Sequence, residues 1–342
     1  MKTGTMIRVL GIAAGAFLAS VSVRAQSVEQ FYRGNVVSLY IGFSPGGGYN
    51  VYARLVARHI GKHIPGNPSV IPLNMEGAGS LRLANWLYNV GPKDGSALGT
   101  VNRGVPFEPL VGNREFVQFD PTEFTWIGSA NNETTVCVAW ERTGITQFEQ
   151  LYEQELFVGG TGPGADDHVF PLLLHEILGT NMRLVTGYAG GNEIDFAMER
   201  GELDGRCGWS WSSVKSTRQH WLDAGNIHIL AQLGLQRHPD LPDIPLILDF
   251  AKTEEDRQIL RLFLLRLVLG RPFFAPPGVP ADRAAALRQA FDQTMTDPAF
   301  LAEAERGRLE ISPASGAEIQ LLLEEAYATP PHLVARAHAL VN

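Results

Sequence analysis

The feature of this sequence that most constrains its fold is a recurring unit of an apolar run, a glycine-rich turn and an amphipathic helical pattern. The apolar runs of the three units lie at 36–43, 156–158 and 183–186. A glycine-rich turn follows each run, and a helical pattern then begins near residue 50, 167 or 192. Strands that alternate with helices in this way are typical of βαβ units, so the sequence predicts an α/β fold with mainly parallel sheets.

Other short apolar runs predict further strands, at 97–101, 134–140, 203–209, 227–233 and 262–269. After Pro276-Pro277-Gly278 the pattern becomes helical, over 281–295, 298–306 and 316–327. This order predicts two lobes, with crossovers near 137 and 233. The expected limits are 30–136 and 233–342 for the first lobe and 137–232 for the second.

The first 25 residues have the layout of a secretory signal peptide. Lys2 and Arg8 form a basic start, Val9 to Val21 is almost entirely apolar, and Val23-Arg24-Ala25 supplies a cleavage site. The apolar run is shorter than the ~20 residues that a membrane-spanning helix needs. We therefore expect export to the periplasm as a soluble protein.

The charge of the chain narrows the classes of partner. Its formal net charge is −8, and the predicted signal peptide carries only basic charges, so the exported chain is more acidic still. An acidic chain without a basic block argues against nucleic-acid binding. Overall charge does not identify a small ligand, because it governs solubility and steering rather than one pocket.

The chain has two cysteines, Cys137 and Cys207, and both lie in strand-like stretches. In an oxidising compartment the two thiols can pair, but a single pair is not a disulfide framework. The sequence leaves two alternatives open, a disulfide or two buried thiols.

The segment Phe43-Ser-Pro-Gly-Gly-Gly-Tyr-Asn50 joins the first predicted strand to its helix. Glycines allow a close approach of the backbone to a ligand, and a helix N-terminus presents unpaired N–H groups with a partial positive charge. Asn50 is expected to cap this helix. Such a turn suits a carboxylate or a phosphate, although the same residues also make an ordinary tight turn.

Two phosphate-binding motifs are excluded at this loop. A P-loop needs a lysine after its last glycine, but Gly47 is followed by Gly48 and Tyr49. The dinucleotide-binding fingerprint needs a third glycine where this chain has Val51.

The run Gly42-Phe43-Ser44-Pro45-Gly46 matches the nucleophile elbow of hydrolases. The residue after the nucleophile must donate its backbone N–H to the oxyanion, and Pro45 has none. The elbow also follows several strands in such hydrolases, whereas only ~20 residues of the exported chain precede Ser44. A hydrolase is therefore a minor alternative.

A series of short motifs follows this loop along the chain. After Phe43–Gly48 come Asn74–Ser80, Pro92–Leu98, Gly160–Gly164 with His168, Tyr188–Gly191, Gly201–Asp204, Leu241–Pro245 and Ala275–Pro280. In this order they strongly resemble the substrate-binding receptors of tripartite tricarboxylate transporters, also called Bug proteins. Each motif alone is weak, but the ordered set spans roughly residues 35 to 325, which is nearly the whole exported chain.

The resemblance implies a type II periplasmic-binding-protein fold, in which two α/β lobes are joined by crossover strands. A small carboxylate would lie between the lobes and be held by three glycine loops, partly through water. The residues that this mapping assigns to the ligand are Ser44, Pro45, Gly46, Gly47, Gly48, Tyr49, Asn50, Gly79, Thr161, Gly162, Gly164, His168, Tyr188, Gly190 and Gly191.

The chain departs from the family pattern near two of these loops. Asn50 replaces the usual aspartate, and Asp166 and Asp167 replace smaller or hydroxylated residues. The aspartates either cap a helix or meet a ligand amine, which would make the ligand zwitterionic. Together with His168 and His175 they lack a recognised metal-ligand spacing, so no metal is expected.

Two further side chains are candidates for the ligand site. Arg103, after the predicted strand at 97–101, either clamps a ligand carboxylate bidentately or forms a surface ion pair. Trp209 belongs to a cluster with Arg206 and Trp211, which either packs in the core or forms a wall for an aromatic ligand.

We therefore predict a periplasmic receptor that captures a small organic carboxylate, performs no chemistry and needs no cofactor. Its expected partners are two integral membrane subunits of a secondary transporter without an ATPase, and the receptor is expected to be a monomer. One alternative is a ligand sensor of the same fold that signals to a membrane kinase. The other is a periplasmic hydrolase that uses Ser44.

Overall fold

The computed structural model describes Met1 and residues 26–341. The predicted signal peptide, apart from Met1, lies outside the described residues. In the part of the chain that is described, none of the helices combines the length and the apolar character needed to cross a membrane.

Six strands form the first sheet, in the order β11-β4-β10-β3-β1-β2. The strands are β1 (Val36–Ile41), β2 (Ser69–Asn74), β3 (Ala97–Thr100), β4 (Thr125–Ser129), β10 (Pro272–Ala275) and β11 (Ala314–Ser315). β1 pairs in parallel with β2 and β3, whereas β10 and β11 run antiparallel to their neighbours.

Helices cover both faces of the first sheet. Successive residues of β10, Phe273 and Phe274, enter different apolar cores, because side chains alternate across a strand. The core on the Phe273 side is covered by α2 (Gly48–Ile60), α10 (Ala281–Met295) and α11 (Pro298–Arg306). The core on the Phe274 side is covered by α3 (Leu81–Asn89) and α12 (Gly316–Tyr327). Two short helices, α1 (Val28–Tyr32) and α4 (Glu108–Val111), complete this lobe.

Five strands form the second sheet, in the order β7-β6-β8-β5-β9. The strands are β5 (Thr135–Trp140), β6 (Leu156–Gly160), β7 (Met182–Thr186), β8 (Gly205–Ser210) and β9 (Ile227–Leu233). One face is covered by α5 (Asp166–Leu178). The other is covered by α6 (Gly191–Glu199), α7 (Trp211–Thr217) and α8 (Gln219–Asp223).

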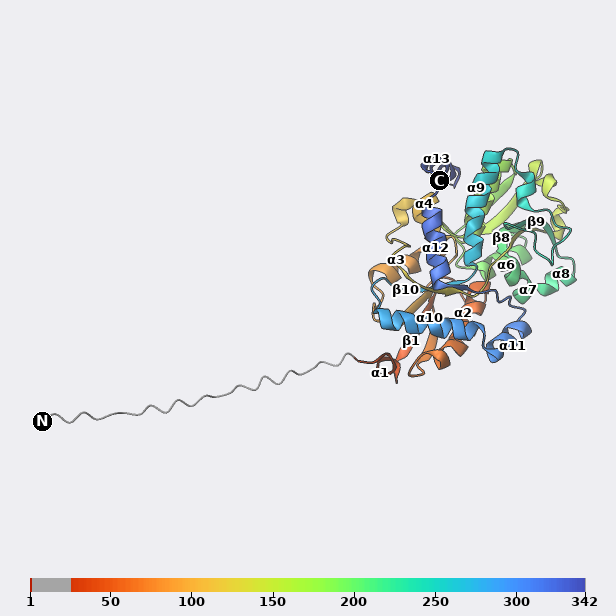
Figure 1. Ribbon diagram of the computed structural model, residues 1–342. Coiled ribbons are helices and arrows are strands. Elements are labelled where there is room, and N and C mark those ends of the chain that lie inside the picture. Colours follow the sequence, from red (N-terminus) through yellow and green to blue (C-terminus); the bar gives the residue numbers. More distant parts are fainter. Residues whose placement is uncertain (2–25, 342) are drawn as a thin grey trace.

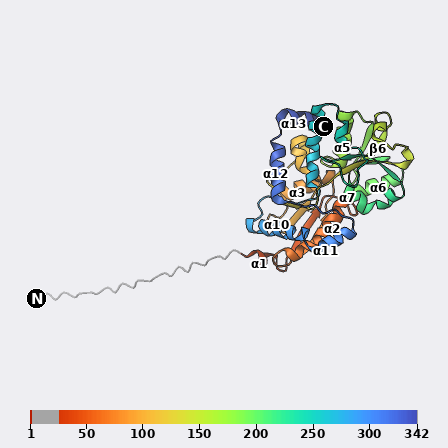
Figure 2. The same cartoon turned by 45° about the vertical axis from the view of Figure 1, so that its right-hand side comes forward.

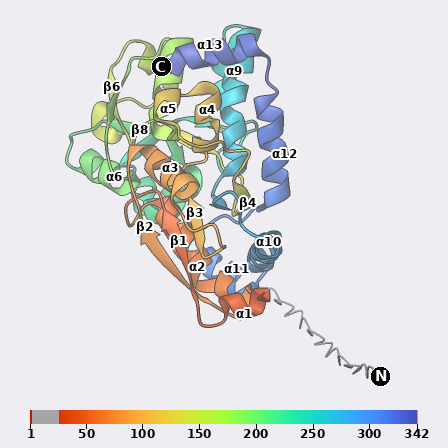
Figure 3. The ribbon, with the colours of Figure 1, turned by 90° about the vertical axis from the view of Figure 1, so that its left-hand side faces the viewer.

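The two sheets lie side by side as two lobes, with α10 and α12 on one side and α6 and β8 on the other (Figure 1 and Figure 2). The chain passes to the second sheet between β4 and β5 and returns through α9 (Glu254–Leu264) to β10. α13 (Pro331–Val341) lies across the molecule against α4 and α5, so the last helix contacts both lobes (Figure 3). The limits of the lobes along the chain, 30–136 with 233–342 and 137–232, stay a prediction.

The α/β class and the two-lobed architecture predicted from the sequence are confirmed. Each sheet is mixed rather than mainly parallel, because the strands next to the crossovers enter in the opposite direction. β5 runs antiparallel to β8 and β9, and β10 runs antiparallel to β3 and β4.

The strand predicted at 262–269 is wrong. The segment forms the end of α9 and a 3₁₀ turn over Leu265–Leu269. A short apolar run cannot be assigned to strand or buried helix by periodicity alone, and tertiary packing decided this one. Arg266, in the middle of the run, is completely buried and faces Asp166.

Of the two alternatives predicted for the cysteines, a disulfide or two buried thiols, the structure shows the disulfide. Cys137 on β5 and Cys207 on β8 are register partners of an antiparallel pair, and they form a disulfide. The bond joins the crossover strand to the centre of the second sheet, with both residues fully buried.

Candidate ligand-binding cleft

The first glycine loop connects β1 to α2 and presents the N-terminus of that helix. Gly47 is the N-cap residue in extended geometry, with no side-chain cap and no acidic residue in the first turn. The backbone N–H groups and the helix dipole at this end are therefore available to an anion. The prediction that Asn50 is the N-cap is wrong: it lies in the first turn, and its Oδ1 accepts a hydrogen bond from Gly46 N–H at 3.3 Å.

The loop after β7 presents a second helix N-terminus from the opposite lobe. Gly190 is the N-cap of α6, again without a side-chain cap. A Cβ atom added at Gly47 would lie 3.7 Å from Gly191 N and 3.9 Å from Asn192 N, so the two helix starts meet directly. Two partial positive charges from different lobes thus converge on one point.

The loop after β6 leads into α5, where Asp166 and Asp167 occupy the first turn. The N-cap residue is Ala165, so neither aspartate caps the helix. Asp167 Oδ1 accepts hydrogen bonds from the N–H and hydroxyl of Thr161, at 3.0 and 2.8 Å. Asp166 is buried beside Arg103, which leaves no free carboxylate there for the ligand amine considered above.

A small cavity of about 40 Å³ lies where these elements meet. By the usual measure of roughly 10–15 Å³ per water, it holds a few water-sized groups. Its lining comes from both lobes: Phe43, Gly47, Gly48, Tyr49, Asn102, Arg103, Asp167, Gly191, Asp195, Arg206, Gly208, Trp209, Ser210, Ser213 and Thr217.

The guanidinium groups of the lining already have protein partners. Arg103 Nε donates to Asp166 Oδ2 at 2.6 Å and Nη2 donates to Ser210 Oγ at 3.1 Å, which links the lobes. Arg206 lies 3.1 Å from Asp167 and 3.2 Å from Asp195. The expected alternatives for Arg103 were a ligand clamp and a surface pair, and the structure shows a buried pair instead.

Burial is the largest influence on the pKa of two acids at the cavity, Asp195 and Asp166. It raises the pKa of Asp195 to about 6, although the neighbouring Arg206 and Arg218 oppose the shift. It also raises the pKa of Asp166, against the effect of Arg103 and Arg266. These carboxylates therefore depend on their arginine partners to stay ionised.

The structure brings part of the predicted site together. The predicted residues that line the cavity are Gly47, Gly48, Tyr49, Arg103, Asp167, Gly191 and Trp209. Those that do not line it are Ser44, Pro45, Gly46, Asn50, Gly79, Thr161, Gly162, Gly164, Asp166, His168, Tyr188 and Gly190.

Several of the predicted residues outside the lining hold the lobes together. Ser44 Oγ donates to Glu193 Oε2 of the second lobe at 2.7 Å. A Cβ at Gly79 would lie 2.5 Å from Pro163 O, so only glycine fits where these two loops meet. Gly164 and His168 line a separate cavity next to Glu108.

Eight lining residues were not among the predicted ligand residues: Phe43, Asn102, Asp195, Arg206, Gly208, Ser210, Ser213 and Thr217. Of these, Arg206 was named only as a member of the cluster with Trp209. Asn102 and Ser210 were within reach of prediction, because they lie at or just after strand ends at the lobe interface. Asp195 lies inside α6, and no local pattern distinguishes it from an ordinary core residue.

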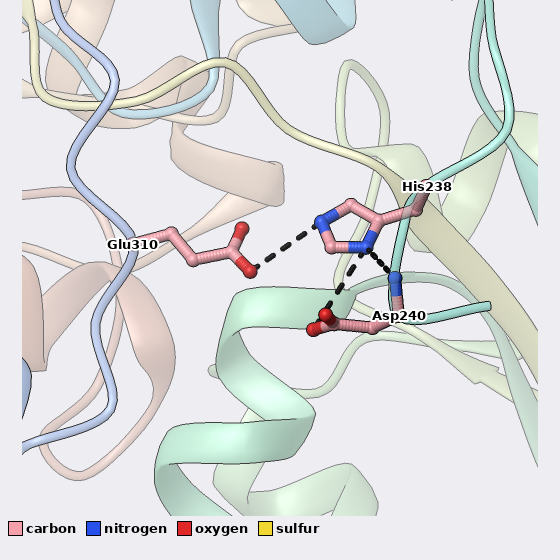
Figure 4. Close-up of side chains that lie close together, drawn as sticks. All are labelled: His238, Asp240 and Glu310. Carbon is pink, nitrogen blue, oxygen red and sulfur yellow. Dashed lines mark hydrogen bonds and ion pairs between the residues drawn. The ribbon is translucent and has the colours of Figure 1, made fainter.

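A second polar cluster lies between the lobes away from this cavity (Figure 4). Ligand atoms of His238, Asp240 and Glu310 lie within 4.8 Å of one another, a spacing that suits a metal ion. Lys215 Nζ donates to Asp240 at 2.5 Å and also to Glu310. An ammonium group therefore already occupies the position that a cation would take.

Comparisons with known proteins agree with this geometry. No known family profile matches the chain. The UPF0065 protein in the tcbD-tcbE intergenic region of Pseudomonas sp. strain P51 is 25% identical over 283 residues, covering 81% of this chain and 78% of that protein. The solved structure of the periplasmic binding protein BugD has a TM-score of 0.71 at 18% identity, over 89% of this chain and 97% of BugD. This chain has the fold of the Bug periplasmic binding proteins.

A second solved structure has the same fold. MatC from Rhodopseudomonas palustris, with bound malate, has a TM-score of 0.70 at 18% identity, over 90% of this chain and 99% of MatC. The Bug-like resemblance predicted from the ordered motifs is thereby confirmed. The prediction of a binding protein rather than an enzyme agrees with both structures, since BugD is a binding protein and MatC holds malate.

Proposed function

We propose that this protein is a periplasmic receptor that closes its lobes on a small organic carboxylate and delivers it to a secondary transporter. The observation that carries the proposal is the meeting of two uncapped helix N-termini, those of α2 and α6, at one inter-lobe cavity. Helix N-termini favour anions, and each lobe contributes one of them, so an anion between the lobes favours closure.

The contacts of Ser44 support binding over hydrolysis. Its hydroxyl donates to a carboxylate, Glu193, rather than to a histidine base. Pro45 follows it and has no N–H for an oxyanion. Ser44 lies outside the cavity lining, whose own acids and bases pair with one another.

The proposed partners are two integral membrane subunits, which accept the ligand from the closed receptor without an ATPase. A sensor that signals to a membrane kinase would bind the same ligand but support no uptake. Uptake of the identified ligand by cells that express the receptor with its membrane subunits separates the two roles. Export is checked by the intact mass of protein from the periplasm, which should lack residues 1–25.

The binding claim is tested first by native mass spectrometry of freshly purified protein, which should show a co-purified organic acid. A panel of carboxylates in a thermal-shift assay follows, with tryptophan fluorescence as a second readout because Trp209 lines the cavity. Trp209→Phe should remove the fluorescence response but keep most of the thermal shift. A flat response to every carboxylate would rule out the proposed function.

A further inference from the structure

The side-chain charges that line the cavity cancel. Arg103 and Arg206 are its cations, and Asp167 and Asp195 are its anions. Arg206 bridges the two aspartates at 3.1 and 3.2 Å, and Arg103 is held by Asp166 at 2.6 Å behind the lining. Each guanidinium of the described lining residues is therefore paired with a carboxylate, and Arg206 Nε keeps a buried N–H without a hydrogen-bond partner.

The shell behind the lining carries a small positive balance. Arg218 lies 3.1 Å from Asp195, Arg271 lies 3.3 Å from Glu133, and Arg266 lies 3.9 Å from Asp166. Arg266 also shares its surroundings with Glu108, whose pKa burial raises to about 7, so that carboxyl is only partly ionised at neutral pH. An ammonium group placed in the cavity would therefore face more positive than negative charge.

The electrostatic field that favours a ligand carboxylate comes from the backbone. The N-termini of α2 and α6 each carry a partial charge of roughly half a unit, which together is about one positive charge. Glu193 in the first turn of α6 is partly exposed and accepts from Ser44, so it offsets this field only in part. The backbone can thus neutralise one ligand carboxylate in a lining whose side chains sum to zero.

Resting on the proposed function, we propose that the cavity selects a small monocarboxylate over dicarboxylates and over amino acids. A second carboxylate would enter a buried, neutral lining without a partner, and an ammonium would be repelled by the arginine shell. The small volume of the closed cavity, about 40 Å³, favours short chains.

The test is isothermal titration calorimetry with two matched trios at about pH 7, where the ligand carboxyl groups are ionised and Glu108 is only partly ionised. The first trio is propionate, malonate and β-alanine, and the second is hexanoate, adipate and 6-aminohexanoate. Each trio keeps the carbon number and changes only the second charge. We expect the monoacid to bind about tenfold or more tightly than its diacid and amino-acid partners, because an unpaired charge in a partly buried site is costly.

The outcomes separate this inference from the proposed function. A diacid or amino acid that binds as tightly as the matched monoacid overturns the inference and leaves the receptor function standing. If no compound of either trio or of a wider carboxylate panel binds, the proposed function is wrong, and the inference that rests on it is wrong too.

Charge variants of the lining test whether its charge balance causes the preference for monocarboxylates. Asp195→Asn removes one negative charge, so the affinity ratio of malonate to propionate should rise about tenfold. Asp167→Asn serves as a second variant, because Asp195 supports two arginines and its replacement risks the fold. Glu202→Gln, at an exposed acid of the same lobe, is the matched control and should leave the ratio unchanged. Folded variants at both positions with an unaltered ratio would contradict the charge account.

Discussion

Gly48 shows how the absence of one side chain sets the fit between the lobes. A Cβ at this position would lie 1.9 Å from Ser213 Oγ and 2.9 Å from Ser213 Cβ, both on the opposite lobe. Rotation of the serine hydroxyl would relieve only the first overlap. Gly48 is the first residue of α2, and the nearest atom of its own lobe to the added Cβ would be Arg271 Nη2 at 3.2 Å, the end of a long side chain.

We expect Gly48→Ala to weaken ligand affinity by about tenfold or more, because the overlap is relieved only by partial reopening of the lobes. The melting temperature should stay or rise slightly, since alanine favours a helix over glycine by ~1 kcal/mol. Calorimetry and thermal denaturation measure the two effects. Gly307→Ala is the control, because its Cβ would meet nothing closer than 3.5 Å. Wild-type affinity in Gly48→Ala would refute this view of closure.

Glu108 is a buried acid that the proposed site does not use. Burial raises its pKa from 4.5 to about 7, against the effects of Arg266 and the backbone N–H groups of Asn113 and Gly164. His168, whose own pKa is lowered by burial, lines the same cavity. Because the folded-state pKa lies above the unfolded value, the folded protein binds a proton between pH 4.5 and 7 that the unfolded chain has released.

The contribution of Glu108 to stability therefore falls as pH rises through this window, and its ionisation costs up to about 3 kcal/mol above it. We expect Glu108→Gln to be more stable than the wild type above pH 7, with the gap closing near pH 4.5. Urea denaturation across this range measures the gap. Glu305→Gln, at an exposed acid, should track the wild type. A pH-independent gap would show that Glu108 does not titrate as described.

Among the elements, β5 and β8 are joined covalently by the Cys137–Cys207 disulfide, which closes a loop of 70 residues in sequence separation. Such a link typically stabilises by about 2–5 kcal/mol. We expect reductant, or the double change Cys137→Ala and Cys207→Ala, to lower the free energy of unfolding by this amount. Ligand affinity should stay nearly constant, because neither cysteine lines the cavity. Denaturation with and without reductant measures the loss of stability, and the stability of the double variant should not change with reductant.

Elements with a strong local signal were predictable from the sequence. The helices at 281–295, 298–306 and 316–327 match α10, α11 and α12, because their helical pattern and their ends were both clear. Buried apolar runs were harder to assign. The segment at 262–269 is helical, which the periodicity of a short apolar run does not reveal. The strands β4 and β10 were missed because burial on both faces removes the alternation of polar residues. The edge strand β2 was missed because Pro72 interrupts its short apolar run.

At the scale of the whole molecule, direct bonds join the lobes at three places around the cavity. Arg103 binds Asp166, Arg271 binds Ser212 and Ser213, and Ser44 binds Glu193. A fourth contact joins Lys215 to Glu310 away from the cavity. Figure 4 shows Glu310 beside His238 and Asp240. These bonds stabilise the closed arrangement, so they add to the apparent affinity of any ligand bound between the lobes.

Glu310→Gln removes the charge of this fourth contact without touching the cavity. We expect ligand affinity to fall by about three- to tenfold, because a partly exposed ion pair contributes on the order of 1 kcal/mol to closure. Small-angle scattering should show a larger radius of gyration for the variant than for the wild type. Added salt screens the ion pair of the wild type, so it should reduce the difference in affinity and in radius between the two proteins. Glu305→Gln, on the same lobe, is the control. An unchanged radius and affinity would show that the cluster does not hold the lobes together.

The candidate site was predictable only in part. The glycine loops were found because glycine, proline and a following helical pattern are local signals, and three of the predicted glycines line the cavity. The partners of Arg103, Asp166 and Asp167 could not be predicted, because these residues pair across separations of 39 to 63 residues along the chain. The sequence showed the charges, and the fold decided which of them neutralise one another.

The sequence by itself determined the α/β class, the three glycine loops and the Bug-like order of motifs, because each depends on neighbouring residues. Only the tertiary structure decided the mixed sheets, the disulfide, and the meeting of α2 and α6 across the cavity. It also decided that the lining neutralises itself. Electrostatic balance is a property of distances in space, and the side chains concerned come from both lobes, so no local pattern encodes it.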